Sequence, residues 1–205
     1  MKTIRLHCAV LCLFSLSVAA APRFTVAPFS ADVTVPIGHG MMGGYWKARS
    51  VADPLYAKGV VLSGGDKPVV FVSVDWCEIR NASFDYWREA LGKAAGTTRE
   101  RVLVSAIHQH DAPVTDLEAQ RILERGGLEG SVCDLAFHEK AVGRVAAAVR
   151  AALKNPKPLT HIGLGQAKVE KVASNRRYVL PDGKISFGRG SASGRNVLAA
   201  NAPEG

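Results

Sequence analysis

Two apolar segments joined by an amphipathic one constrain the fold more than any other feature of this sequence. Residues 68–76 and 101–107 are continuous runs of β-branched and other apolar residues, typical of strands that are buried on both faces. Between them, residues 83–95 repeat apolar side chains at spacings of three and four, as in an amphipathic helix. A strand, a helix and a strand with short links form a βαβ unit with parallel strands. We therefore expect an α/β fold, with a mixed β-sheet that contains this unit and helices packed on it.

The segments on either side add strands and helices to this unit. A turn at residues 63–66 predicts a hairpin that joins a short strand to the first apolar run. Residues 114–131 are polar and contain three glycines, and we expect a short helix and a surface excursion there. Apolar spacing predicts a long helix over residues 135–153. Residues 159–172 predict one or two further strands.

The first twenty residues have the order of a secretory signal peptide. Lys2 and Arg5 precede a short apolar run, which ends in small residues around Ala20. The run is too short to span a membrane. We expect cleavage after Ala20 and a protein that is secreted or exported to the periplasm, with residues 21–205 as the mature part.

The end of the sequence is polar and rich in glycine. From Ser174 to Gly205 it has few residues that form a core, and a compact domain seldom contains such a long structureless segment. Either this tail is disordered, or the sequence breaks off within a larger protein of which residues 21–205 would be the N-terminal part.

Charge and cysteine content restrict the partners and the crosslinks. The net charge is +8, but the basic residues are scattered and do not alternate with aromatic residues. This distribution argues against nucleic-acid binding. Outside the expected signal peptide the only cysteines are Cys77 and Cys133. An exported protein can join two such residues as a disulfide, whereas the apolar strand beside Cys77 favours a buried thiol.

Three polar residues lie at the ends of the two apolar runs or just after them. Asp75 lies at the end of the first run, and His108 and His110 follow the second. The carboxyl ends of parallel strands are where ligands bind. Residues i and i+2 of an extended chain point to the same side, so the two imidazoles are placed to bind one metal ion, with Asp75 as a candidate catalytic carboxylate. The alternatives are two histidines that only form hydrogen bonds in a loop, and an aspartate that caps the following helix.

Two further candidates lie in loops. Arg176 follows the last predicted strand, where an arginine can clamp a carboxylate or stabilise an oxyanion; a solvated basic turn is the alternative. His39 lies in a glycine-rich loop at residues 38–44, whose composition indicates unusual backbone angles or close approach to another group. We interpret His138 and His161 as structural or surface residues.

Several of these segments, taken in order, resemble the N-terminal part of the neutral/alkaline non-lysosomal ceramidase family. No single segment is specific, but their order and separations fit over about residues 25–180. The residues that carry the resemblance are ADVTVP at 31–36, GMMGG at 40–44, DPLYA at 53–57, FVSVD at 71–75, VLVSAIHQH at 102–110 and NRR at 175–177.

The resemblance implies a zinc-dependent hydrolase that cleaves the amide bond of N-acyl sphingoid lipids. It implies that His108 is a zinc ligand, that His110 lies in the same site, and that Arg176 positions substrate or stabilises charge. A zinc-bound water would attack the amide carbonyl, with the metal as Lewis acid. The partners would be a small-molecule or lipid substrate and, transiently, a membrane surface. The family's other ligands, a His, a Glu and a Tyr, would lie beyond Gly205, so we expect this chain alone to be inactive.

Two positions depart from the family pattern. Asp111 stands where family members usually have Ser or another small residue, and Arg177 and Tyr178 stand where ceramidases tend to have Ser and Pro. The added charge favours, as an alternative, a hydrolase of a more polar ester or N-acyl substrate. A second alternative is a non-catalytic binding module that kept the fold.

Overall fold

Residues 24–169, 178–186 and 199–200 are described by the structure, a computed structural model. The chain divides into two compact units, Met1–Thr160 and His161–Gly205. The expected signal peptide and Arg176 lie outside the described residues. Among the residues described, none of the helices combines the length and the apolarity that a membrane span requires.

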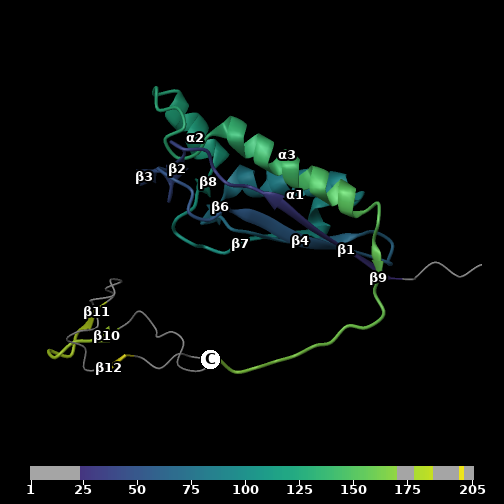
Figure 1. Ribbon diagram of the computed structural model, residues 1–205. Coiled ribbons are helices and arrows are strands. Elements are labelled where there is room, and N and C mark those ends of the chain that lie inside the picture. Colours follow the sequence, from purple (N-terminus) through teal and green to yellow (C-terminus); the bar gives the residue numbers. More distant parts are fainter. Residues whose placement is uncertain (1–23, 170–177, 187–198, 201–205) are drawn as a thin grey trace, which may run out of the picture. The chain divides into compact units, whose positions relative to one another are not determined.

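A mixed β-sheet organises the first unit (Figure 1). Its strands are β1 (Thr25–Asp32), β4 (Tyr56–Ser63), β5 (Val69–Val74), β7 (Val102–Ala106) and β9 (Lys157–Pro158). In the order β7-β5-β4-β1-β9, β5 and β7 are parallel and the other neighbours are antiparallel. The expected α/β class, the hairpin between β4 and β5, and the parallel pair are confirmed.

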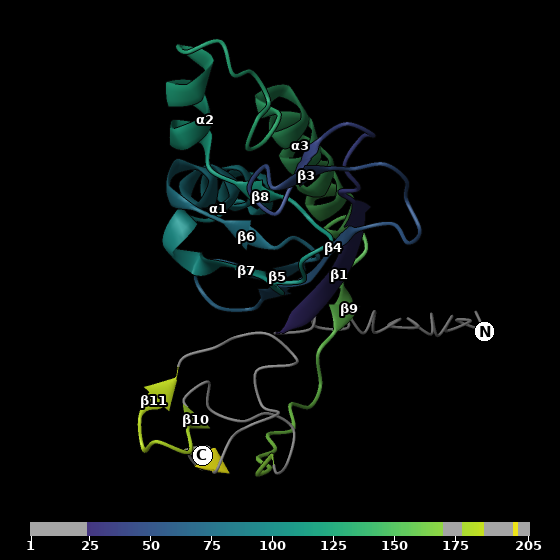
Figure 2. The same cartoon turned by 90° about the vertical axis from the view of Figure 1, so that its left-hand side faces the viewer.

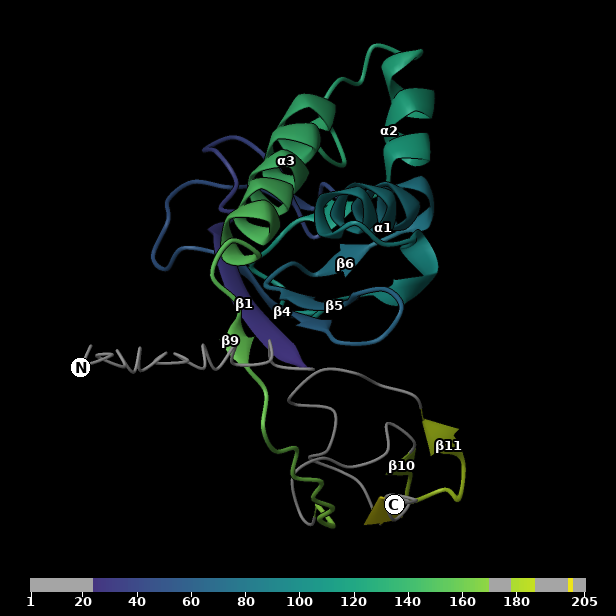
Figure 3. The same ribbon diagram turned by 90° about the vertical axis from the view of Figure 1, so that its right-hand side faces the viewer.

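Two long helices cover one face of this sheet (Figure 3). The first, α1 (Asn81–Ala95), ends at Gly96, which adopts the left-handed conformation with φ 69°. The second, α3 (Leu135–Ala152), begins after Asp134, whose carboxylate accepts a hydrogen bond from the backbone N–H of Phe137. The core lies between the helices and the sheet and includes Trp76, Trp87, Leu91, Val142, Val145 and Val149.

Short elements surround the carboxyl ends of the parallel strands (Figure 2). A third helix, α2 (Leu117–Glu124), confirms the short helix predicted within residues 114–131. The parallel pair β6 (Glu78–Ile79) and β8 (Val114–Thr115) lies between α2 and the main sheet, and β2 (Gly40–Met41) pairs with β3 (Trp46–Lys47). The remaining short elements are η1 (Arg99–Arg101) and, in the second unit, β10 (Tyr178–Val179), β11 (Ile185–Ser186) and β12 (Ala199–Ala200).

The strands predicted over residues 159–172 are absent wherever the structure describes that range, and the prediction is wrong for residues 159–169. Pairing with β1 stops with the hydrogen bond from the N–H of Leu159 to the carbonyl of Phe24. Because β1 begins at Thr25, a longer β9 would have no strand to pair with. Residues 170–172 lie outside the described part.

The face of the sheet opposite the helices is exposed within the first unit, and the prediction that both strands are buried on both faces is wrong for this face. Phe71 is 40% exposed and its cross-strand neighbour Leu103 is 56% exposed, whereas Val72 and Val104 on the other face are buried. The physical reason is that α1 and α3 both pack on the same face. The apolar runs therefore alternate between covered and uncovered side chains.

Candidate metal centre

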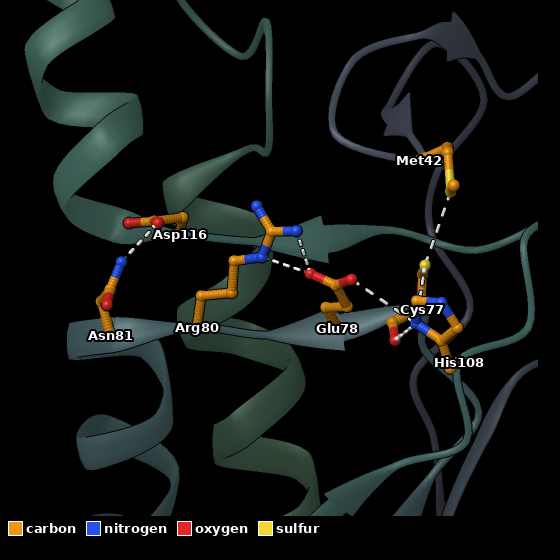
Figure 4. Close-up of polar contacts among 7 residues, drawn as sticks. All are labelled: Met42, Cys77, Glu78, Arg80, Asn81, His108 and Asp116. Atoms are coloured by element: carbon orange, nitrogen blue, oxygen red, sulfur yellow. Dashed lines mark hydrogen bonds and ion pairs between the residues drawn. The ribbon is translucent and has the colours of Figure 1, made fainter. Parts of the chain in front are cut away.

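The ends of β5 and β7 bring two distant segments together (Figure 4). Their parallel pairing continues past the strand ends, because the N–H of Ile107 donates to the carbonyl of Val74 and the N–H of His108 donates to the carbonyl of Trp76. This pairing places the side chain of His108 beside that of Cys77. The relationship follows from the βαβ unit, in which both strands end at the same edge.

His108 and His110 lie side by side as predicted, but through a turn and not through the extended chain on which the prediction rested. Their ring centroids are 5.1 Å apart and the rings are nearly perpendicular, at 87°. His108 has φ 62°, a left-handed conformation that turns the chain sharply. The side chain of Gln109 fixes this turn, because its amide donates to the carbonyl of Asp75 and its oxygen accepts from the N–H of Asp111.

Cys77 completes a group of three donors that could hold a metal ion. One ligand atom from each of Cys77, His108 and His110 lies within 4.8 Å of the others. The Sγ atom of Cys77 is 3.7 Å from Nδ1 of His108 and donates to Sδ of Met42 at 3.5 Å. Burial raises the pKa of the Cys77 thiol, and the nearby carboxylate of Glu78 raises it further. Sequence reasoning missed this role, because Cys77 matters only once the end of β7 is placed next to it.

A carboxylate faces the imidazole of His108 from β6. Oε1 of Glu78 lies 3.5 Å from Nδ1 of His108, and the other oxygen of Glu78 is paired with the guanidinium of Arg80. The same Nδ1 atom is 3.2 Å from the carbonyl oxygen of Cys77. Both oxygens face the ring nitrogen that also lies beside Sγ of Cys77, so they accept a proton from Nδ1 only while that nitrogen holds no metal. The sequence offered no direct signal for Glu78.

Asp75 has a backbone partner. Its Oδ2 atom accepts a hydrogen bond from the N–H of Tyr56 at 2.9 Å, and its own N–H donates to the carbonyl of Tyr56. Asp75 is not one of the three grouped donors. The alternative that it caps the next helix is wrong, since Arg80 holds the N-cap position of α1. Its catalytic role stays a prediction.

His39 is a buried connector between the glycine-rich loop and α3. Its Nδ1 atom is 2.7 Å from the carbonyl oxygen of Gly40, and its Nε2 atom accepts from the N–H of Asp134 at 3.1 Å. Burial lowers its pKa. With both nitrogens engaged inside the protein, His39 has a structural role in the described part of the chain.

The expected close approach at the glycine-rich loop is confirmed. A Cβ atom at Gly40 would lie 2.7 Å from the carbonyl oxygen of Val132, and one at Gly44 would lie 2.2 Å from that of Ser131. Only glycine fits such contacts. They hold β2 and β3 against the segment that leads into α3.

His138, His161 and the two cysteines differ in burial. His138 is buried, as a structural residue, and burial lowers its pKa to about 4. His161 is exposed, in the second unit. Cys77 and Cys133 are both free and buried. The disulfide alternative is therefore not realised between them.

A cavity of about 680 Å³ borders the histidine turn, with Gln109 and Asp111 in its wall. The two histidines are not among its lining residues. The rest of its lining mixes apolar and charged side chains, including Met41, Trp46, Lys47, Arg49, Asp53 and Leu55. The cavity is large enough for a small ligand.

The donor set fits a zinc ion. Imidazole nitrogen and cysteine sulfur are the ligands that zinc prefers in proteins. Donors gathered at the carboxyl ends of parallel strands define a candidate metal site in a protein of the α/β class.

Comparison with solved structures shows which known proteins have a similar fold. The chain is similar to neutral ceramidase from Pseudomonas aeruginosa, with a TM-score of 0.51 and 20% sequence identity over 67% of this chain and 22% of the ceramidase chain. A ceramidase complexed with C2 gives the same values. The chain thus matches less than a quarter of the length of those ceramidases. No protein-family model and no curated protein sequence matches it. The resemblance expected from the sequence is confirmed at the level of the fold.

Proposed function

We propose that this chain is the N-terminal part of an exported, zinc-dependent hydrolase of amide bonds with a ceramidase-like reaction. The observation that carries the proposal is the pairing of His108 and His110, whose rings are 5.1 Å apart at the ends of the parallel strands. The fold is similar to that of neutral ceramidase. N-acyl sphingoid lipids are accordingly the proposed substrate class.

His108 and His110 are the proposed zinc ligands. A zinc ion at such a site acts as a Lewis acid and lowers the pKa of a bound water to near neutrality. The residues around the histidines hold them in place: Glu78 faces the ring of His108, and Gln109 fixes the turn between the two rings. The contacts of Gln109 fix the backbone from which both imidazoles project.

Arg176 and Asp75 are the proposed catalytic residues. An arginine supplies charged donors to the oxyanion that forms when an amide carbonyl is attacked. A carboxylate at the strand end is suited to hold a proton during the reaction. The hydrogen bond from the N–H of Tyr56 fixes the direction of the Asp75 carboxylate.

The surroundings of the cavity bear on the substrate. Tyr45 and Trp46 are exposed and contact each other edge to face, and Trp46 also lines the cavity. Exposed Trp and Tyr favour contact with a membrane surface, where one end of the ring is apolar and the other is wet. This arrangement supports a lipid substrate taken from a membrane by transient contact.

A second candidate is a hydrolase of a more polar N-acyl or ester substrate. It is favoured by the charges that line the cavity, which are those of Lys47, Arg49, Asp53 and Asp111. A long acyl chain needs an apolar groove, and unpaired charges in such a groove would cost free energy. The relative rates on long-chain and short-chain N-acyl substrates separate the two candidates.

The deciding experiment measures zinc and hydrolysis together. The protein as its gene encodes it is purified, dialysed, and assayed for zinc by elemental analysis and for hydrolysis of N-acyl sphingosines. Its matched variants are His108→Ala with His110→Ala, and His161→Ala as a control histidine. We expect about one zinc per chain, lost together with activity in the double variant and kept in the control.

Two outcomes contradict the proposal. Zinc that remains in the double variant means that another site binds it. Zinc that is bound through His108 and His110, without turnover of any N-acyl or ester substrate, favours the non-catalytic module. Export is tested separately by N-terminal sequencing, with Ala21 as the expected first residue of the mature protein.

A further inference from the structure

Cys77 lies at the distance from His108 that two ligands of one ion have. In tetrahedral zinc, with Zn–S of about 2.3 Å and Zn–N of about 2.0 Å, sulfur and nitrogen ligands are separated by about 3.5 Å. The observed distance from Sγ of Cys77 to Nδ1 of His108 is 3.7 Å. The nitrogen of His110 falls within the same 4.8 Å limit. The three donors therefore do not need to rearrange greatly to surround one ion.

The backbone holds these donors in rigid segments. Cys77 is fixed by its own N–H, which donates to the carbonyl of Pro113, and His108 is fixed by the bond from its N–H to the carbonyl of Trp76. Trp76 is itself fully buried and donates its indole N–H to the carbonyl of Val33. A site built on such anchored segments is preorganised.

We propose that Cys77 is the third protein ligand of the metal site, so that residues 77–110 supply a Cys-His-His set on their own. This inference rests on the proposed metal site of His108 and His110 and adds a thiolate to it. Three protein ligands leave one position of a tetrahedral ion open, which is the coordination of hydrolytic rather than structural zinc. The ion would then bind without ligands from beyond Gly205, contrary to the expectation from the ceramidase resemblance.

Met42 is a hydrogen-bond partner of the Cys77 thiol in the metal-free protein. Its Sδ atom is 3.5 Å from Sγ of Cys77 and accepts the thiol hydrogen. Zinc in proteins is bound by cysteine sulfur, histidine nitrogen and carboxylate oxygen, and thioether sulfur is not among these ligands. Substitution of Met42 thus leaves the proposed zinc set intact, and Met42→Leu is a matched variant for the site.

The test is spectroscopic and needs no catalysis. The 205-residue chain is stripped of metal, kept reduced, and titrated with Co²⁺, which replaces zinc and gives a thiolate charge-transfer absorption in the near ultraviolet only when sulfur is bound. We expect this absorption in the wild type, in Met42→Leu and in Cys133→Ser, which removes the other buried thiol. We expect it to vanish in Cys77→Ser, with at least a tenfold loss in affinity, since even outer partners contribute about 10- to 100-fold.

A second measurement does not depend on the folding of any variant. X-ray absorption of the zinc-loaded wild-type chain should show one sulfur at about 2.3 Å together with nitrogen or oxygen ligands at about 2.0 Å. A first shell without sulfur overturns the inference. Circular dichroism and the fluorescence of the buried Trp76 and Trp87 show whether each variant is folded.

The outcomes separate this inference from the proposed function. Cobalt that binds through the histidines without thiolate absorption, or with absorption unchanged in Cys77→Ser, refutes the role of Cys77 and leaves the zinc hydrolase proposal standing. Failure of the chain to bind any cobalt or zinc refutes the three-ligand set. If the protein as its gene encodes it is also free of zinc, the proposed function fails as well.

Discussion

Nε2 of His39 accepts a hydrogen bond from the backbone N–H of Asp134 at 3.1 Å, although 95 positions separate the two residues. On the other side of the ring, Nδ1 lies 2.7 Å from the carbonyl oxygen of Gly40 and must therefore carry the proton. A doubly protonated ring has no acceptor, so both bonds exist only in the neutral form. One tautomer of one side chain thus joins the glycine-rich loop to the start of α3.

Stability should fall on acidification because of this bond and of buried His138. Burial lowers the pKa of His39 in the folded protein, and that of His138 to about 4, whereas both titrate near 6.5 when unfolded. Below pH 6.5 the unfolded state therefore binds more protons. The free energy of unfolding should decrease by up to about 1.4 kcal/mol per pH unit for each histidine.

Urea unfolding between pH 8 and pH 4 measures this dependence. His138→Leu removes one of the two buried imidazoles and should reduce the slope. A free energy of unfolding that stays constant from pH 6.5 to pH 4 would contradict the neutral, buried state of both rings.

The close contact at Gly44 should make it intolerant of any side chain. Gly38 and Gly44 have similar backbone angles, with φ 90° and 93°, but only Gly44 faces a carbonyl oxygen, that of Ser131, at 2.2 Å from an added Cβ. Gly38→Ala should cost only the strain of a left-handed residue, about 1–2 kcal/mol. Gly44→Ala should cost that and about 1–3 kcal/mol more for the clash. Equal thermal stabilities of the two variants would show that the 131–132 segment moves away freely.

Asp75 can be tested for chemistry apart from structure. Asp75→Ala leaves the N–H of Tyr56 without its side-chain acceptor and should lower the free energy of unfolding by about 1–3 kcal/mol. Asp75→Asn keeps an acceptor oxygen and should cost less than about 1 kcal/mol. If Asp75 transfers a proton during hydrolysis, Asp75→Asn should still lower kcat by about 100-fold or more. Normal kcat in Asp75→Asn assigns the residue to structure alone.

The uncovered face of the sheet predicts opposite outcomes at adjacent positions of β7. Leu103 is 56% exposed and Val104 is 6% exposed. Leu103→Ser should change the free energy of unfolding of this chain by about 0.5 kcal/mol or less. Val104→Ser removes buried apolar groups and adds a buried hydroxyl, which should cost about 2–4 kcal/mol. Similar losses at both positions would mean that Leu103 is covered.

Local patterns were enough to predict most of the first unit. The spacing of Trp87 and Leu91 located α1 to within two residues, and the short links fixed the parallel pairing of β5 and β7. The apolar run around Phe71 led to a wrong prediction of burial, because apolar composition does not show which face of the sheet the helices cover. Only the direction in which α1 and α3 pack decides that.

Part of the candidate site was predictable from the rule that ligands bind at the carboxyl ends of parallel strands. It led to His108 and His110, which lie two and four positions after the end of β7 at Ala106. It did not locate Cys77 or Glu78, because the chain after β5 bends toward Pro113 and brings these residues back to the histidines. Asp75 was grouped with the histidines by its position in the chain, while its carboxylate is directed to the N–H of Tyr56.

The left-handed backbone of His108 determines which residues could replace it at low conformational cost. At φ 62°, glycine or asparagine would hold the same turn at lower conformational cost than an ordinary residue. A lineage that no longer used the imidazole would be free to drift toward those two residues. The amino acid found at this position across divergent descendants of the fold therefore tells which of them are still under selection for the ring.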